Sequence, residues 1–376
     1  MHSKIASASL VGLSCLSTIA SAAPFTFPLS NGFPKVANPS SQLTAIEQQA
    51  HGTLPNGSPP PNITADTETS LELIAFNELF EVAFFTELLS NVTNNVTGFQ
   101  FNDSNARNVV ISALTAVQAQ EELHALNANG ALAHFGLSPI QPCEYNFPVS
   151  DFPTAIALAS TFTDVVLGTL QDVASLLATD GDDGLIRGVV SVVGQEGEQN
   201  GFYRELLNKT PSALPFLTTS TREFAFSALN QNFIVPGSCP NIGEITLPIF
   251  QTLTVDTQNI QPTTQTLQFS VTINCPEGGW KNYASRAPGS GSERSASYYS
   301  SLSLVYINQQ NLPVVEPITN VSIEGNTVTF DAEFPFDQFL MNGLTIAAVT
   351  NTAGPFTSAD AVAKDTIFGP GLIEIN

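Results

Sequence analysis

Residues 71–89 read LELIAFNELFEVAFFTELL. Apolar side chains recur in this stretch at every third or fourth position, which places them on one face of an α-helix. Glu78 lies in the middle of that apolar face. A buried carboxylate is stable only when it is hydrogen-bonded, paired or bound to a metal ion. The stretch therefore predicts a core helix that brings a glutamate into the protein interior.

The first half of the chain contains several long segments with the helical period. The expected helices span residues 67–90, 104–134, 153–178 and 185–208, and a shorter fifth helix is expected at 212–229. Turn-forming residues separate them, most clearly Asp180-Gly181-Asp182-Asp183-Gly184 between the third and fourth helices. Four long helices joined by such loops predict a four-helix bundle.

The second half of the chain has a different pattern. Alternation of apolar and polar residues predicts strands at 245–255, 267–273, 302–307, 321–323, 327–334 and 344–349. Clusters of Gly, Pro and Asn separate these segments, as in a β-sandwich. The sequence thus predicts an α+β multidomain chain, with a signal peptide at 1–22, an extended or disordered leader rich in Pro, Asn and Ser at 23–65, a helical bundle at 66–239 and a sandwich-like, all-β domain at 240–376.

The N-terminal residues predict secretion. Lys4 precedes an apolar core, and the small residues Ala20-Ser21-Ala22 provide a cleavage site. The core is shorter than the roughly 20 apolar residues that span a bilayer, and no later stretch is expected to be long enough. We therefore expect a soluble extracellular or cell-wall protein without a membrane span.

The charge balance of the chain is strongly acidic. Removal of residues 1–22 takes away Lys4 and no carboxylate, so 11 basic and 33 acidic side chains become 10 and 33, a net charge of −23. A protein that binds nucleic acid needs lysine and arginine side chains to neutralise phosphates. Nucleic acid is therefore not expected as a partner.

Sequons and cysteines fit an extracellular chain. Candidate N-glycan acceptors stand at Asn56, Asn62, Asn91, Asn95, Asn102, Asn208 and Asn320. Three of them fall in residues 91–103, which are expected to form an exposed loop. Cys15 leaves with the signal peptide, so Cys143, Cys239 and Cys275 remain and at most one disulfide can form within the chain. Cys143 and Cys239 lie in Pro-containing loops beside predicted helices, and this pair is favoured.

Polar residues also interrupt the apolar face of other helices at a similar depth. In the second helix, Glu121 and His124 have the i, i+3 spacing that puts a carboxylate beside an imidazole. In the fourth helix, Glu196 and Gln199 interrupt the apolar face. In the third helix, Thr163 occupies the place where a further glutamate would enter. If consecutive helices run antiparallel, these side chains meet in the middle of the bundle.

Carboxylate bundles that bind two iron or manganese ions use a Glu from each of two helices and Glu-x-x-His from the other two. This chain supplies part of that set, Glu78, Glu121, His124 and Glu196, which could hold one iron or manganese ion. The alternative is a buried hydrogen-bonded network in which Thr163, Gln199 and Tyr203 satisfy the carboxylates. The sequence leaves both interpretations open. Asp164 is expected in solvent, and Glu81 in solvent or between helices.

Three motifs carry a resemblance to a known family. They are Leu73-Ile74-Ala75-Phe76-Asn77-Glu78-Leu79-Phe80-Glu81-Val82-Ala83-Phe84-Phe85, Glu121-Glu122-Leu123-His124 and Gly194-Gln195-Glu196-Gly197-Glu198-Gln199. Over about residues 66–235 the chain resembles the ferritin-like family that contains desiccation-related proteins. Over nearly its whole length it is similar to the secreted fungal branch called late sexual development or stress-response proteins. The resemblance implies a ferritin-like four-helix bundle and, where the full ligand set exists, a di-metal centre. Thr163 and Gln199 depart from that set, so a symmetric two-metal centre is not expected.

Two functions are compatible with these features. The favoured one is a secreted, development- or stress-associated glycoprotein whose degenerate bundle has a structural or interaction role, with a cell-wall or extracellular glycan or protein as partner. The other is a metal-binding or metal-dependent redox protein that uses the partial carboxylate and histidine site. Hydrolase and phosphate-loop motifs are absent from the sequence, so enzymatic activity is not favoured, and the enzyme class left open is a metal-dependent oxidoreductase. Trp280, with basic residues near it, could bind glycan or pack against the helical domain.

Overall fold

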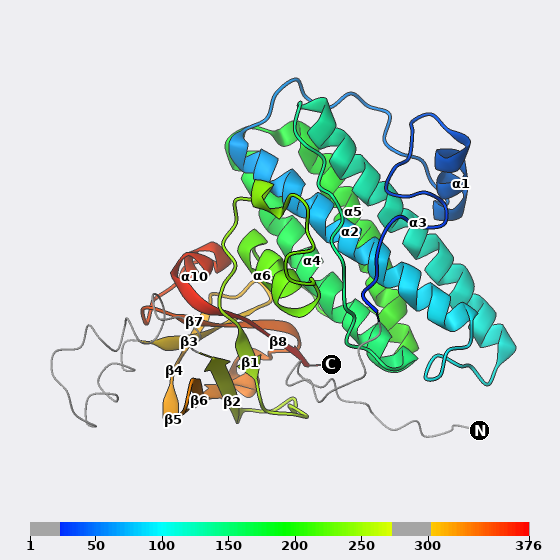
Figure 1. Ribbon diagram of the computed structural model, residues 1–376. Helices are drawn as coiled ribbons and strands as arrows, with labels where there is room; N and C mark the ends of the chain where they lie inside the picture. The colour runs from blue at the N-terminus through cyan, green and yellow to red at the C-terminus, as the bar shows by residue number, and fades with distance from the viewer. Residues whose placement is uncertain (1–22, 273–301, 376) are drawn as a thin grey trace.

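The computed structural model describes residues 23–272 and 302–375, which form a helical part and a β-rich part (Figure 1). The bundle consists of α2 (Ala65–Thr93), α3 (Ser104–His134), α4 (Phe152–Asp180) and α5 (Ile186–Leu206). Two four-stranded antiparallel sheets follow in the C-terminal part. The expected fold class, a helical bundle followed by a β-rich region, is confirmed. The predicted signal peptide, Cys275 and the Trp280 loop lie outside the described residues.

The four long helices begin and end within a few residues of their predicted bounds. At the start of α4, Asp151 accepts a hydrogen bond from the backbone N–H of Thr154 and caps the helix. The fifth helix is shorter than expected, because α6 spans Arg222–Asn232 and residues 212–221 form a loop. Pro215 removes a backbone N–H from that segment and so opposes helix formation there.

The segment before the bundle is ordered, which corrects the expectation of an extended or disordered leader. It contains α1 (Ser41–Ala50), whose Leu43, Ile46 and Ala50 are buried in a cluster with Ala119 and Leu123 of α3. Upstream of α1, Phe33 is fully buried, and Asn31 donates to both carboxylate oxygens of Glu122, at 2.9 and 3.1 Å. Composition did not reveal this order because the apolar anchors are few and prolines separate them.

One helix of the described residues, α4, is long and apolar enough to cross a membrane by length and composition. The expectation that no later stretch would be long enough is therefore wrong. In this structure 83% of the apolar window of α4 is buried inside the protein. Within the bundle, α4 packs against α2 and α5. Outside the bundle, α6 and β7 (Gly343–Thr350) pack against α4 as well.

The β-rich part consists of two sheets with a shared core. One sheet has the strand order β1 (Leu253–Val255), β2 (Gln265–Thr272), β6 (Thr327–Phe334) and β5 (Thr319–Glu324), and the other the order β4 (Val314–Pro317), β3 (Ser303–Asn308), β7 and β8 (Thr366–Ile375). Short helices α9 (Phe336–Phe339) and α10 (Ala359–Asp365) lie between strands. Residues 245–252 are not a strand, and β4 and β8 were not expected, since Pro317 and Gly369-Pro370-Gly371 conceal their strand pattern.

The bundle docks on the outer face of the sheet that contains β3 and β7, with α6 and α10 beside the contact (Figure 1). Every residue of β7 is buried, because one face of the strand packs in the sandwich and the other against helices. Asp164, which was expected in solvent, is also buried. Asp164 is 6% exposed, accepts a hydrogen bond from Asn200 at 3.0 Å and has a pKa raised by burial.

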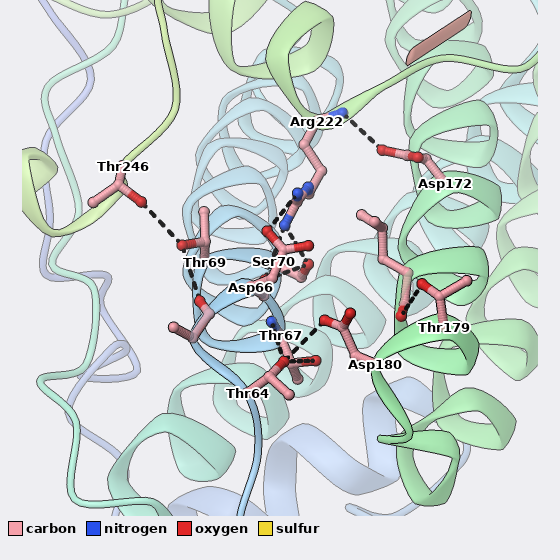
Figure 2. Close-up of polar contacts among 12 residues, drawn as sticks. Thr64, Asp66, Thr67, Thr69, Ser70, Asp172, Thr179, Asp180, Arg222 and Thr246 are labelled. Atoms are coloured by element: carbon pink, nitrogen blue, oxygen red, sulfur yellow. Dashed lines mark hydrogen bonds and ion pairs between the residues drawn. The ribbon is translucent and has the colours of Figure 1, made fainter. Parts of the chain in front are cut away.

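Arg222 joins three helices at the start of the bundle (Figure 2). Its guanidinium forms an ion pair with Asp66 at 2.8 Å and donates to the hydroxyl of Ser70 at 2.9 Å, both in the first turns of α2. Its backbone N–H donates to Asp172 of α4 at 3.3 Å. Because Arg222 is the first residue of α6, these bonds fix that helix across α2 and α4.

Candidate metal centre

Four side chains with metal-ligating groups converge in the interior of the bundle. Glu78 comes from α2, Glu121 and His124 from α3, and Glu196 from α5. One ligand atom from each of the four lies within 4.8 Å of the others. The structure therefore brings together the four residues that the sequence proposes as ligands.

The imidazole of His124 faces the three carboxylates. Its Nδ1 lies 2.8 Å from Oε2 of Glu121, 3.5 Å from Oε2 of Glu78 and 3.9 Å from Oε1 of Glu196. The carboxylate side chains are at most 2% exposed, whereas the His124 side chain is 16% exposed. Solvent therefore reaches the cluster on the side of the histidine.

Several oxygens of the cluster lack a hydrogen-bond partner. Within the described part of the chain, Oε2 of Glu78 and both carboxylate oxygens of Glu196 are buried and accept no hydrogen bond. An unsatisfied buried polar group costs about 1–3 kcal/mol, and more when it is charged. Buried carboxylate oxygens beside one imidazole form a ligand set of the kind that iron and manganese accept. The residues present thus fit a transition-metal ion.

The surroundings of Glu78, Glu196 and His124 raise the pKa of each group. Burial raises the pKa of Glu78 to about 7, although the His124 imidazole opposes this shift. Burial and the charges of Glu78 and Glu121 raise the pKa of Glu196 well above its usual value. Burial alone would lower the pKa of His124, but the charges of Glu121 and Glu78 raise it well above its ordinary value. A metal ion that binds here must displace protons from these ligands.

Gln199 takes part in the cluster as a hydrogen-bond donor. Its amide Nε2 donates to Oε1 of Glu121 at 2.7 Å, and its Oε1 accepts a hydrogen bond from the Tyr203 hydroxyl at 3.2 Å. Gln199 thus satisfies a carboxylate, as the network interpretation predicts. The hydroxyl of Tyr203 donates to Gln199 rather than to a carboxylate.

Two other residues of the network behave differently from expectation. The hydroxyl of Thr163 is buried without a hydrogen-bond partner among the described residues, so Thr163 donates no hydrogen bond to the carboxylates. Its side chain is also too short to replace a glutamate. Glu81 is not in solvent, because it is 1% exposed and bonded to Asn77 at 2.9 Å. Burial and the charges of Glu121, Glu196 and Glu78 raise the pKa of Glu81 well above its usual value.

Sequence reasoning missed Gln120. Its Oε1 accepts hydrogen bonds from Gln195 and Gln199 of α5, both at 3.1 Å. Its Nε2 donates to the carbonyl oxygen of Ala50 at the end of α1, at 3.3 Å. A signal was present, because Gln120 lies four residues before His124 and so on the same side of the helix. Glutamine is common on helix surfaces, and this signal therefore did not stand out.

The other predicted residues are not part of the carboxylate cluster. Cys143, in the connection between α3 and α4, forms a disulfide with Cys239, which follows α6. Asn91 lies in the last turn of α2 rather than in a loop, and it is only partly exposed. The remaining sequon asparagines are exposed, at Asn56, Asn62, Asn95, Asn102, Asn208 and Asn320.

Comparison with protein families identifies the helical part. Residues 69–209 match the family model described as the ferritin-like domain. This range covers most of α2 and all of α3, α4 and α5, and so includes every residue of the cluster. No curated protein matches the chain.

Proposed function

We propose that the ferritin-like domain binds a single iron or manganese ion through Glu78, Glu121, His124 and Glu196. The observation that carries this proposal is the convergence of four ligand atoms within 4.8 Å, with buried oxygens of Glu78 and Glu196 that accept no hydrogen bond from the described residues. A bound ion of this kind would supply one-electron redox chemistry. The protein's part is to hold the ligands, to keep water from the carboxylates and to leave the site accessible at His124.

The hydrogen bonds of Glu121 support a site for one ion rather than two. Gln199 occupies the position where a two-metal set would have a second histidine, and its amide donates to Oε1 of Glu121 instead of offering an imidazole ligand. The chain therefore lacks that nitrogen ligand for a second ion. Thr163 also offers no carboxylate from α4. With Gln199 in place of a histidine and Thr163 in place of a glutamate, the bundle keeps the ligands for one ion and lacks those for a second.

The proposed setting is extracellular. The disulfide between Cys143 and Cys239 supports it, because structural disulfides persist in oxidising compartments. The apolar N-terminus with its small-residue cleavage site and the exposed sequons support secretion and N-glycosylation. On this proposal the protein acts outside the cell or in the cell wall, in the development- or stress-associated role that the resemblance implies, with extracellular glycan or protein as its surroundings.

A structural or interaction role without metal is the second candidate. The observation that favours it is the set of hydrogen bonds that already serves Glu121, from His124 at 2.8 Å and from Gln199 at 2.7 Å. On this account, protons bound to Glu78 and Glu196 neutralise these carboxylates, and no metal ion is needed. The two candidates differ in whether stability responds to metal.

Metal should stabilise the wild-type protein against heat. An ion that binds only the folded state at 100 times its Kd adds about 2.7 kcal/mol to the free energy of unfolding. We expect Mn²⁺ or anaerobic Fe²⁺ to raise Tm, chelator to reverse the rise, and Glu121→Ala/His124→Ala to abolish it. The measurement is scanning calorimetry of the full chain.

The matched control for that experiment is Glu198→Ala/His134→Ala, which removes the same residue types from exposed positions on α5 and α3. The control should respond to metal like the wild type. An unchanged Tm for wild type with either ion would favour the structural role.

A further inference from the structure

A chain of amide hydrogen bonds connects the N-terminal segment with a metal ligand. It begins at the carbonyl oxygen of Ala50, which accepts from Gln120. Gln120 in turn accepts from Gln199 at 3.1 Å, and Gln199 donates to Glu121 at 2.7 Å. The chain therefore runs from α1, through α3 and α5, to a carboxylate of the cluster.

The hydrogen bonds orient each amide in this chain. Gln199 turns its amide nitrogen toward Glu121 and its oxygen toward the Tyr203 hydroxyl. A backbone carbonyl can only accept hydrogen bonds. Gln120 must turn its nitrogen toward Ala50, which leaves its oxygen for the second N–H of Gln199. Loss of the Gln120 amide thus deprives Gln199 of one acceptor.

This arrangement determines which oxygen of Glu121 is available. With Oε1 bonded to Gln199, Oε2 is the oxygen that lies 2.8 Å from Nδ1 of His124. If Gln199 loses its acceptor on Gln120, a buried N–H is left unsatisfied. Rotation of the Gln199 side chain relieves this state, and it also releases Oε1 of Glu121. The carboxylate then no longer has one preferred orientation.

We propose that Gln120 is a positioning residue of the metal site, and that α1 orients the ligands through it. This inference rests on the proposed function, because it concerns the same four ligands. Outer hydrogen-bond partners of metal ligands commonly set affinity by 10- to 100-fold. α1 is suited to the role because Leu43, Ile46 and Ala50 are buried against α3, so the position of its last carbonyl is fixed by packing.

The test is Mn²⁺ affinity by titration calorimetry, with the Mn²⁺ electron paramagnetic resonance spectrum of the bound ion as the second readout. Because Gln120 acts on Glu121 through Gln199, one hydrogen bond further out, Gln120→Ala should weaken Mn²⁺ binding about 10-fold, the lower end of that range, and alter the spectrum. Gln120→Met keeps most of the side-chain volume without the amide and should behave alike. Ile46→Asp, which undocks α1 and touches no ligand, should weaken binding in the same direction. Asn127→Ala, an exposed amide on α3, should bind Mn²⁺ like the wild type.

Each outcome separates this inference from the proposed function. If the wild type binds neither Mn²⁺ nor Fe²⁺, this inference and the proposed function are both contradicted. If the wild type binds and folded Gln120→Met shows the same affinity and spectrum, the positioning role is overturned while the metal site stands. If Gln120→Met binds Mn²⁺ more weakly but Ile46→Asp binds it like the wild type, the Gln120 amide positions the ligands without help from α1. The role of α1 is then overturned.

Discussion

Replacement of Glu196 by leucine is expected to make the metal-free protein more stable and to abolish metal binding. Glu196 is 1% exposed, and neither of its oxygens has a hydrogen-bond partner in the described chain. Its charge is further opposed by Glu78 and Glu121. An apolar side chain removes this cost, and because an unsatisfied buried polar group costs about 1–3 kcal/mol, Glu196→Leu is expected to raise the free energy of unfolding by a similar amount.

The same substitution removes a ligand from the proposed site. Loss of an outer partner alone costs 10- to 100-fold in metal affinity, so loss of Glu196 should cost at least about 100-fold. Urea unfolding of the metal-free protein and Mn²⁺ titration measure the two effects. Glu198→Leu, two residues along the same helix and exposed, should leave metal affinity unchanged. A destabilised variant with unchanged affinity would show that Glu196 serves the fold and not a metal ion.

Removal of the disulfide between Cys143 and Cys239 is expected to produce the largest loss of stability. The two cysteines are 96 residues apart, and a crosslink that closes a loop of about 100 residues stabilises the folded state by about 4.7 kcal/mol in the chain-entropy account. Cys143→Ser/Cys239→Ser should therefore lower the free energy of unfolding by about 4–5 kcal/mol. Equilibrium unfolding in urea measures the change.

Reduced wild type is the matched reference for this variant, and it should unfold at nearly the same urea concentration. Each substitution also places a hydroxyl where a sulfur was, and Cys143 is 3% exposed, so we expect the variant to be slightly less stable than the reduced protein. A loss below about 1 kcal/mol in both would contradict the expectation that this crosslink constrains the unfolded chain.

The bundle and its cluster follow from one feature of the sequence. The helices are long, and their apolar positions keep the helical period over many turns, so α3 was expected at 104–134 and spans Ser104–His134. Glutamates on an apolar face are costly and therefore conspicuous. That cost makes Glu78, Glu121 and Glu196 recognisable from the amino-acid sequence alone.

Features that depend on contacts between distant segments were not accessible in the same way. Asp164 lies on a helix face that is polar in sequence, but Asn200 of α5 and Glu374 of β8 pack against its carboxylate. α1 has few apolar residues, and its burial depends on the surface that α3 presents. Gln120 acquires its role from the carbonyl of Ala50 and the amide of Gln199. No local pattern predicts which helix surface another segment will cover.

Metal content is the most direct test of whether the bundle holds one metal ion. The protein is expressed with the whole sequence given, purified without chelator or metal-affinity tag, and its metals are quantified by plasma mass spectrometry. Glu121→Ala/His124→Ala is the control. We expect close to one iron or manganese ion per wild-type chain and none in the variant. No metal in the wild type after reloading, or an equal content in both proteins, would contradict a metal site formed by these residues.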